Sequence, residues 1–256
     1  MSHKKKITIL AILGFLCILY GSFITLDWTQ HFFNMDNPAA PELPYSRATK
    51  VLFCFMCAVL AWMIGKDGLN RVDTRKVVII FSLIIAGDIC LVIFPTPYVG
   101  IALFIAAQVF LILRNGQGFR QYNKSGDRKR RVLWDAVTGA IIAVILVLYV
   151  SLVLIPLLQG SYLLYFIIVY GLLVCVSLWT AWAAVRIGYF PPLNAWLIAI
   201  GITFFFTDDL FVGLNMSLPT TTIARSLVTY VVWIFYSPAL ALLALSGYRW
   251  GKTGDS

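Results

Sequence analysis

Runs of apolar residues, each close to the length of a membrane span, recur along the whole chain and constrain its fold more than any other feature. A helix of about 20 residues crosses the roughly 30 Å hydrocarbon core of a bilayer. Continuous apolar runs are typical of helices, whereas the strands of a membrane barrel alternate apolar and polar residues. Of the 256 residues, 61% are hydrophobic and 12% are charged, against about 45–50% and 25% in soluble domains. The sequence therefore predicts an all-α polytopic membrane protein and excludes a soluble globular one.

We expect eight transmembrane helices in a single helical domain, residues 1–256. The expected spans are residues 7–26, 51–64, 77–94, 101–113, 136–157, 163–185, 195–214 and 226–245. The second run would cover only about 21 Å, so this helix should extend into flanking residues such as Ala48 and Thr49. The first run follows three lysines, as in a signal peptide, but it is too long and lacks a cleavage pattern, so we expect it to be retained.

Basic residues set the expected orientation, because short cytoplasmic loops retain lysine and arginine. With the N-terminus in the cytoplasm, all 20 basic residues except Arg47, Lys50 and Arg225 fall on the inner side. Both termini are therefore expected in the cytoplasm. The net charge of +9 then indicates contact with anionic lipid headgroups at the cytoplasmic loops rather than with nucleic acid. We expect a multi-pass protein of the bacterial cytoplasmic membrane, or of the endoplasmic reticulum in a eukaryote; its oligomeric state is left open.

The cysteines and histidines argue against a metal or redox centre. All five cysteines lie in apolar runs, and the Cys54-x-x-Cys57 spacing has no second pair or nearby histidine to complete a metal site. His3 and His31 both lie outside the expected spans. We expect the cysteines to pack the interior, and we expect no metal and no cofactor.

Acidic residues inside the expected spans are the strongest functional candidates. Asp88, Asp208 and Asp209 lie within spans, and Asp135 opens the fifth span at the cytoplasmic interface. A carboxylate in a bilayer costs several kcal/mol unless it is paired, solvated or protonated. The other acids are expected in loops: Asp27, Asp36, Glu42, Asp67, Asp73, Asp127 and Asp255.

Asp88 and Asp208 are expected at similar depths, because the third and seventh spans run in the same direction and carry these acids at similar distances from their starts. Their spacing by four spans indicates two four-helix halves of the same orientation, a 4+4 internal repeat. Two carboxyl groups in one buried site favour one protonated and one ionised group. Such a pair suits acid-catalysed cleavage of acetals and enol ethers, in which the anion stabilises an oxocarbenium-like cation.

Several residues next to these acids or in neighbouring spans are candidates for substrate binding: Gly87, Gln108, Asp135, Tyr170, Thr207 and Tyr236. Gly87 allows close approach of a neighbouring helix and leaves room for substrate. The alternative is structural, with the acids satisfied by Thr207, Gln108 or a tyrosine hydroxyl merely to hold helices together.

At these residues the sequence resembles the YhhN-like lysoplasmalogenase family, eight-span membrane proteins with a Gly-Asp motif in the third span and a Ser-Asp motif in the seventh. Gly87-Asp88 matches the first motif, and either Thr207-Asp208 or Asp208-Asp209 matches the second. The resemblance runs from about Val77 to the end of the chain. It implies hydrolysis of the vinyl-ether bond of a lysoplasmalogen by Asp88 with Asp208 or Asp209, without a cofactor.

The chain departs from the family pattern at two places. Gln108 and Leu111 follow Phe104 where the family usually has histidine and tyrosine, and Leu240 stands where it has glutamine. These departures bear on substrate identity and leave the two-acid core intact. The main rival function is a proton- or ion-coupled transporter using the same aspartates, and a non-catalytic scaffold or receptor is the second.

Overall fold

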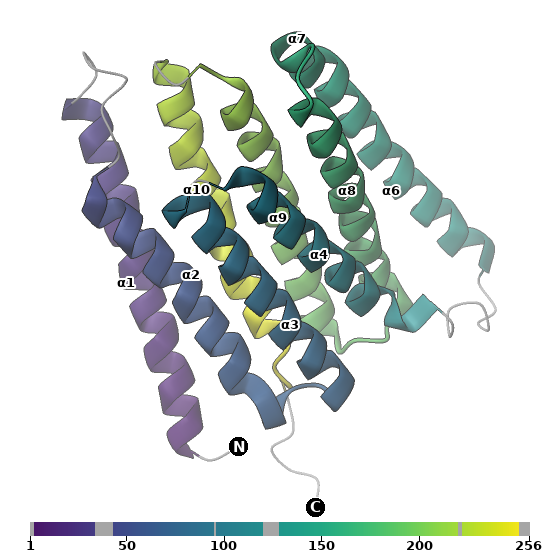
Figure 1. The fold of residues 1–256 in the computed structure, drawn as a ribbon. Helices are drawn as coiled ribbons and strands as arrows, with labels where there is room; N and C mark the ends of the chain where they lie inside the picture. The colour runs from purple at the N-terminus through teal and green to yellow at the C-terminus, as the bar shows by residue number, and fades with distance from the viewer. Residues whose placement is uncertain (1–2, 34–42, 95, 120–127, 220–221, 251–256) are drawn as a thin grey trace, which may run out of the picture.

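The computed structural model describes residues 3–33, 43–94, 96–119, 128–219 and 222–250, and these are almost entirely helical. Eight helical segments are long and apolar enough to span a membrane, which confirms the predicted fold class and number of spans. The described elements are α1 (His3–Phe33), α2 (Pro44–Ile64), η1 (Gly65–Asp67), α3 (Arg71–Asp88), η2 (Ile89–Ile93), α4 (Pro97–Asn115), η3 (Gly116–Gly118), α6 (Arg128–Tyr149), η4 (Val150–Leu154), α7 (Ile155–Leu158), α8 (Leu163–Ile187), α9 (Pro192–Ser217) and α10 (Ile223–Leu245) (Figure 1).

Several helices begin before their apolar runs because local signals start them. Pro44, Pro97 and Pro192 occupy the first turns of α2, α4 and α9, where the missing N–H of proline costs no hydrogen bond. The side chain of Asn70 accepts a hydrogen bond from the backbone N–H of Asp73 at 2.8 Å and caps α3. The second span therefore includes Ala48 and Thr49, as expected from its short apolar run.

Two spans contain a π-helical turn, which the sequence did not indicate. The third span changes from α3 to the π-turn η2 directly after Asp88, and the fifth span passes from α6 through the π-turn η4 into α7. In η2 the backbone N–H of Phe94 bonds to the carbonyl of Ile89 at 3.0 Å. A π-turn re-aims side chains without breaking a helix, and such turns often lie at functional sites.

Six of the eight spans form a closed ring. Contacts run in order from α2 to α3, α4, α8, α9 and α10, and α10 packs back against α2. Outside this ring α1 packs on α2 and α10, and α6 packs on α8 (Figure 1). The outer helices are the first and fifth spans, which are the positions that a 4+4 repeat would give. The repeat itself stays a prediction.

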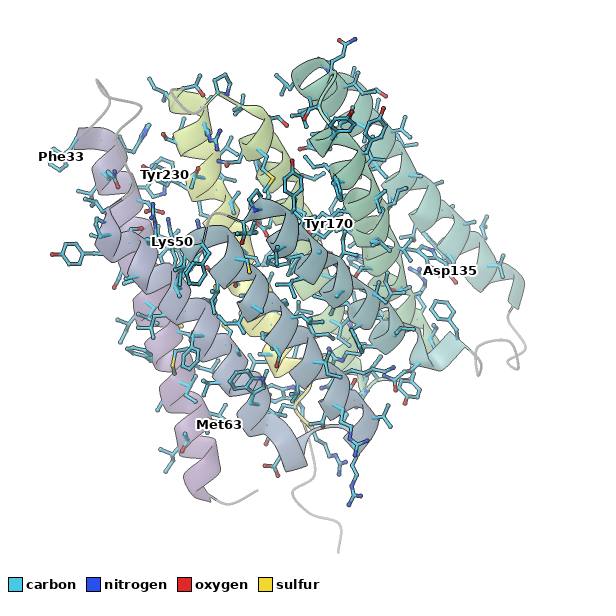
Figure 2. The ribbon with its side chains drawn as sticks, in the orientation of Figure 1. Phe33, Lys50, Met63, Asp135, Tyr170 and Tyr230 are labelled. Atoms are coloured by element: carbon cyan, nitrogen blue, oxygen red, sulfur yellow. The ribbon has the colours of Figure 1, made fainter. Side chains whose placement is uncertain are left out.

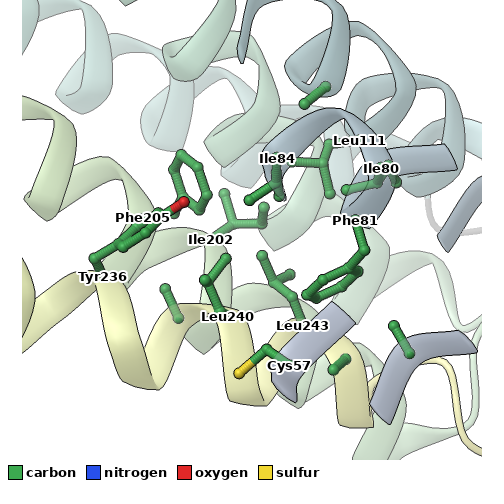
Figure 3. Close-up of a cluster of buried hydrophobic side chains, with 14 of the residues drawn as sticks. Cys57, Ile80, Phe81, Ile84, Leu111, Ile202, Phe205, Tyr236, Leu240 and Leu243 are labelled. Atoms are coloured by element: carbon green, nitrogen blue, oxygen red, sulfur yellow. The ribbon is translucent and has the colours of Figure 1, made fainter. Parts of the chain in front are cut away.

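The first turn of α1 and the last turn of α10 lie at the same end of the bundle, which we call the terminal end; the other is the far end (Figure 1). Toward the terminal end the ring is filled by tightly packed apolar side chains (Figure 3). Ile84, Ile202 and Leu243 are each at most 1% exposed. Leu240, one of the departures from the family pattern, is fully buried in this core.

A buried ion pair ties α3, α4 and the end of α10 together at the terminal end. The Arg114 guanidinium donates to both carboxylate oxygens of Asp73, at 2.8 and 3.2 Å, and to the hydroxyl and carbonyl of Ser246. Asp73 is fully buried in the first turn of α3. The expectation that Asp73 lies in a loop is therefore wrong, because α3 begins at Arg71, ahead of the apolar run.

Candidate functional site

A cavity of about 540 Å³ lies inside the ring, between the apolar core and the far end. All six ring helices contribute to its lining, which is mostly apolar and includes Asp88, Asp208, Asp209, Tyr170 and Tyr236. Its volume lies within the range of about 300–1,000 Å³ that is typical of ligand sites. The structure thus brings together all three candidate catalytic acids and two of the candidate binding residues.

Asp88 is held by a tyrosine hydroxyl from across the ring. It lies at the end of α3, is 5% exposed, and accepts a hydrogen bond from the Tyr236 Oη, which is 2.8 and 2.9 Å from its two carboxylate oxygens. The Tyr236 ring packs edge-on against Phe205 and is tilted against Phe104. These ring contacts hold the Tyr236 hydroxyl in position to donate to Asp88, so Asp88 acts as a hydrogen-bond acceptor.

Asp208 and Asp209 are adjacent on α9, and both reach the cavity. The Tyr170 hydroxyl donates to Asp209 Oδ1 at 2.8 Å (Figure 2 labels Tyr170). Asp208 is 2% exposed, and its Oδ1 has no hydrogen-bond partner among the described residues. A buried polar atom left unpaired is costly, so Asp208 is the group in this site most in need of a proton, a water or a ligand.

Three candidate binding residues lie near the acids but do not line the cavity. Thr207 donates its hydroxyl to the carbonyl of Thr203 in its own helix, at 2.9 Å. Gln108 is 1% exposed within the ring. Gly87 lies at the α3–α4 contact, where an added Cβ would stand only 2.8 Å from the Phe104 ring. The close helix approach expected at Gly87 is present, and a role of these residues in substrate binding stays a prediction.

Asp135 lies outside the cavity, in α6 near the terminal end. Arg186 of α8 donates two hydrogen bonds to Asp135 Oδ1, at 2.5 and 2.9 Å. Figure 2 shows Asp135 well apart from Tyr170. The structure therefore does not bring Asp135 to the other candidates, because its place in the chain fixes it at the outer helix α6, where it joins α6 to α8.

A buried lysine at the far end of the cavity was missed by the sequence analysis. Lys50 of α2 lines the cavity together with Arg47, is 1% exposed, and pairs with Asp27 at 2.7 Å. Asp27 is fully buried in α1, so its expected place in a loop is wrong; α1 continues beyond the apolar run to Phe33. The one available signal was that Arg47 and Lys50 are exceptions to the inner placement of basic residues.

Metal-binding side chains do not gather in the part of the chain that the structure describes: no group of three or more His, Cys, Asp or Glu residues there could hold a metal ion. Cys54 and Cys57 are buried, unoxidised thiols in α2. The chemical groups of the cavity are thus carboxyl, hydroxyl, amide and basic side chains in an apolar lining.

One of the comparisons with known proteins identifies a family for the chain. No curated protein and no solved structure matches the chain. The model of the YhhN family matches residues 45–247, a range that includes every residue lining the cavity. The match confirms the resemblance seen in the sequence and extends it toward the N-terminus to include α2, so the chain belongs to the YhhN family.

Proposed function

We propose that this protein is a membrane-embedded hydrolase that cleaves the vinyl-ether bond of a lysoplasmalogen or a related lysolipid. The observation that carries the proposal is the meeting of Asp88, Asp208 and Asp209 in one apolar cavity inside the helical ring. Enol-ether hydrolysis requires a proton donor and an anion on either side of one carbon–oxygen unit. Membership of the YhhN family is consistent with a hydrolase.

The hydrogen bonds of the site suggest which aspartate donates the proton and which acts as the anion. Asp88 accepts from Tyr236, an arrangement that favours its ionised form. Asp208 Oδ1 and Asp209 Oδ2 both lack a hydrogen-bond partner among the described residues. Asp209 accepts from Tyr170 at its other oxygen, so Asp208 is the carboxyl group that is favoured to keep its proton until substrate takes it. We therefore assign Asp208 as the acid and Asp88 as the anion. Asp209, held by Tyr170, adds a second negative charge near the developing cation.

In the proposed reaction the Asp208 proton is transferred to the alkenyl carbon remote from the ether oxygen. The π electrons of the double bond form the new C–H bond, and the carbon attached to oxygen becomes an oxocarbenium ion, which Asp88 stabilises. Water then bonds to this carbon and gives a proton to Asp88. The hemiacetal breaks its carbon–oxygen bond, returning its hydroxyl proton to Asp208 while Asp88 protonates the glycerol oxygen. One water is consumed, and a fatty aldehyde and a glycerophospho-headgroup leave.

The shape of the ring favours this reaction over transport. A transporter must open its site to both sides of the membrane in turn. Here the apolar core, which includes Ile84, Ile202 and Leu243 (Figure 3), fills the described ring helices on the terminal side of the acids. The third span carries a π-turn rather than a break beside Asp88. A hydrolase needs access from only one side.

The test is fatty-aldehyde release from a pure lysoplasmalogen by the detergent-solubilised protein. We expect release by the parent chain and its loss in Asp88→Asn and Asp208→Asn, with gel filtration as the folding control. Asp209→Asn should retain part of the rate. Asp135→Asn, an acid that lies in a span but outside the cavity, is the matched control and should keep the parent rate. Absence of release from folded parent protein with alkenyl, alkyl and acyl lysolipids would overturn the hydrolase and favour transport.

A further inference from the structure

We propose that Tyr149 is a positioning residue of the acid site: from the outer helix α6 it holds Asp209 of α9 at its hydrogen bond with Tyr170. The proposal rests on the proposed function and gives a part in it to a helix of which no described residue lines the cavity. It starts from one hydrogen bond. The Tyr149 hydroxyl donates to the backbone carbonyl of Leu210, the residue that follows Asp209, at 2.6 Å.

The Tyr149 hydroxyl is fastened to the backbone of α9 at two points. Besides the bond to the Leu210 carbonyl, the backbone N–H of Leu214 hydrogen-bonds to the same oxygen. In an α-helix this carbonyl and this N–H would bond to each other. A side chain that bonds within the hydrogen-bond ladder of a helix is one of the established causes of a bend. The turn of α9 that follows Asp209 is therefore held by α6.

A glycine makes this close approach possible. Gly213 lies in the same turn of α9, and a Cβ added to it would stand 2.7 Å from the Tyr149 hydroxyl oxygen. The hydroxyl thus occupies the space that any other side chain at this position would need. Gly213 also lines the cavity, so Tyr149 packs directly behind the cavity wall.

A second contact of α6 lies beside Tyr170. Leu146 precedes Tyr149 by about one helical turn, and a Cβ added to Gly171 of α8 would lie 3.3 Å from the Leu146 Cδ1. Gly171 is the residue after Tyr170, whose hydroxyl donates to Asp209 at 2.8 Å. Leu146 and Tyr149 therefore pack against the two helices that this hydrogen bond joins, at the level of the bond itself.

The π-turn of the fifth span points to the same place. The π-turn η4 begins at Val150, directly after Tyr149, whereas η2 begins directly after Asp88. Such turns often lie at functional sites. In the described part of the chain, one π-turn thus follows an acid of the cavity, and the other follows the residue that holds α9 beside Asp209.

The expected effect is on the rate and not on substrate binding. A shift of about 1 Å in a catalytic group can lower a rate by about a hundredfold, so loss of the Tyr149 hydroxyl should lower kcat by about tenfold. Tyr149 does not line the cavity, so KM should keep its parent value. Stability should change little, because the Leu210 carbonyl and the Leu214 N–H can bond to each other once the hydroxyl is removed.

The test is a double-mutant cycle on kcat and KM with a lysoplasmalogen in detergent. Tyr149→Phe should lower kcat by about tenfold at constant KM, and it should add little to the loss in Tyr170→Phe, where the bond to Asp209 is already absent. Tyr20→Phe is the matched control: Tyr20 also lies on an outer helix and donates to the carbonyl of Ile234 in a ring helix, at 3.1 Å. Its kcat should equal that of the parent chain. Independent losses from Tyr149→Phe and Tyr170→Phe, or a higher KM at constant kcat, would overturn the proposal.

Gly213→Ala provides a second route to the same loss, including the case in which Tyr149→Phe fails to fold. The added Cβ should displace the Tyr149 hydroxyl and lower kcat. It should add little to Tyr149→Phe, because the nearest ring carbons of Tyr149 would be 3.6 Å from the Cβ, an ordinary contact. A folded Gly213→Ala protein with the parent kcat would contradict the proposal.

A spectroscopic readout needs no cleavage. With 3-fluorotyrosine in place of Tyr170, the fluorine NMR resonance reports the hydrogen bond to Asp209, and Asp209→Asn calibrates the change. Tyr149→Phe should move the resonance in the direction of Asp209→Asn, and Tyr20→Phe should leave it unchanged. A resonance that Tyr149→Phe does not move would sink the proposal. A moved resonance in a protein that releases no aldehyde would leave Tyr149 as the residue that positions Asp209 and remove the proposed hydrolase.

Discussion

The hydroxyl of Tyr236 lies within hydrogen-bond distance of both oxygens of Asp88, and it comes from a residue 148 positions away in the sequence. Replacing Tyr236 by Phe keeps the ring and its packing and removes only this donor. A hydrogen bond to a charged group contributes about 1.5–3 kcal/mol, so aldehyde release should fall about tenfold to a hundredfold. The measurement is kcat for a lysoplasmalogen in detergent, with thermal unfolding alongside.

Tyr20→Phe is the matched control. The Tyr20 hydroxyl also crosses between helices, donating to the carbonyl of Ile234 at 3.1 Å, but Tyr20 does not line the cavity. It should leave kcat at the parent value. Equal losses in Tyr20→Phe and Tyr236→Phe would mean that the rate reports general helix packing and not the contact with Asp88.

The acids of the site could be predicted from the sequence, whereas its basic end could not. Asp88 and Asp208 stand out because a carboxylate inside an apolar run is costly. Lys50 and Asp27 lie at the ends of apolar runs, where charged residues are common at the membrane surface. Only the extension of α1 and α2 beyond those runs, followed by their packing, buries the two charges against each other.

At the scale of elements, the contact between α3 and α4 depends on Gly87. A Cβ at this position would lie 2.8 and 2.9 Å from two carbons of the Phe104 ring, and overpacking of this kind costs about 1–3 kcal/mol. Gly87→Ala should therefore lower the midpoint of thermal unfolding in detergent. It should also slow aldehyde release, because any shift of α3 moves Asp88, the next residue.

Gly14→Ala is the control, since an added Cβ there meets no atom within 4 Å. This change in α1 should be neutral or slightly stabilising, because alanine favours a helix over glycine by about 1 kcal/mol. A Gly87→Ala protein with the parent unfolding midpoint would show that Phe104 moves aside freely and that the helix contact is not tight.

The ion pair between Asp73 and Arg114 fastens three elements at the terminal end. Removing one partner leaves a buried charge, which costs about 3–5 kcal/mol, whereas removing both costs far less. Asp73→Leu and Arg114→Met should each lower the free energy of unfolding by about that amount, and the double variant should recover most of it. Denaturant unfolding of the parent chain, the two single variants and the double variant measures these free energies. If the loss in the double variant equalled the sum of the two single losses, the pairing would be contradicted.

At the scale of the whole molecule, the sequence predicted eight spans but not the ring that they form. Hydrophobic length is enough to identify a span. In a bilayer, however, the lipid-facing and protein-facing sides of a helix are both apolar, so periodicity does not say which helices are inside. Inside the ring, polar bonds join distant segments, such as Tyr170 to Asp209 and Tyr236 to Asp88, and no local pattern in either partner indicates them.

The ring and the distribution of basic residues together predict the side from which substrate enters. The cavity lies toward the far end, and the basic residues predict that the terminal end faces the cytoplasm. Lysolipid would then come from the outer leaflet. An exposed residue at each end serves as a reporter: Gln159 after α7 at the far end and Arg71 at the start of α3 at the terminal end.

In intact cells a membrane-impermeant maleimide should label Gln159→Cys without treatment and Arg71→Cys only after permeabilisation. The parent chain sets the background, since its five cysteines all lie in the spans. The opposite pattern would place the terminal end outside. Because the acids and Lys50 are reached from the far end, that result would reverse the leaflet that supplies the lipid and leave the chemistry of the site unchanged. The predicted sidedness of uptake therefore rests on loop charge, and the proposed reaction rests on the ring.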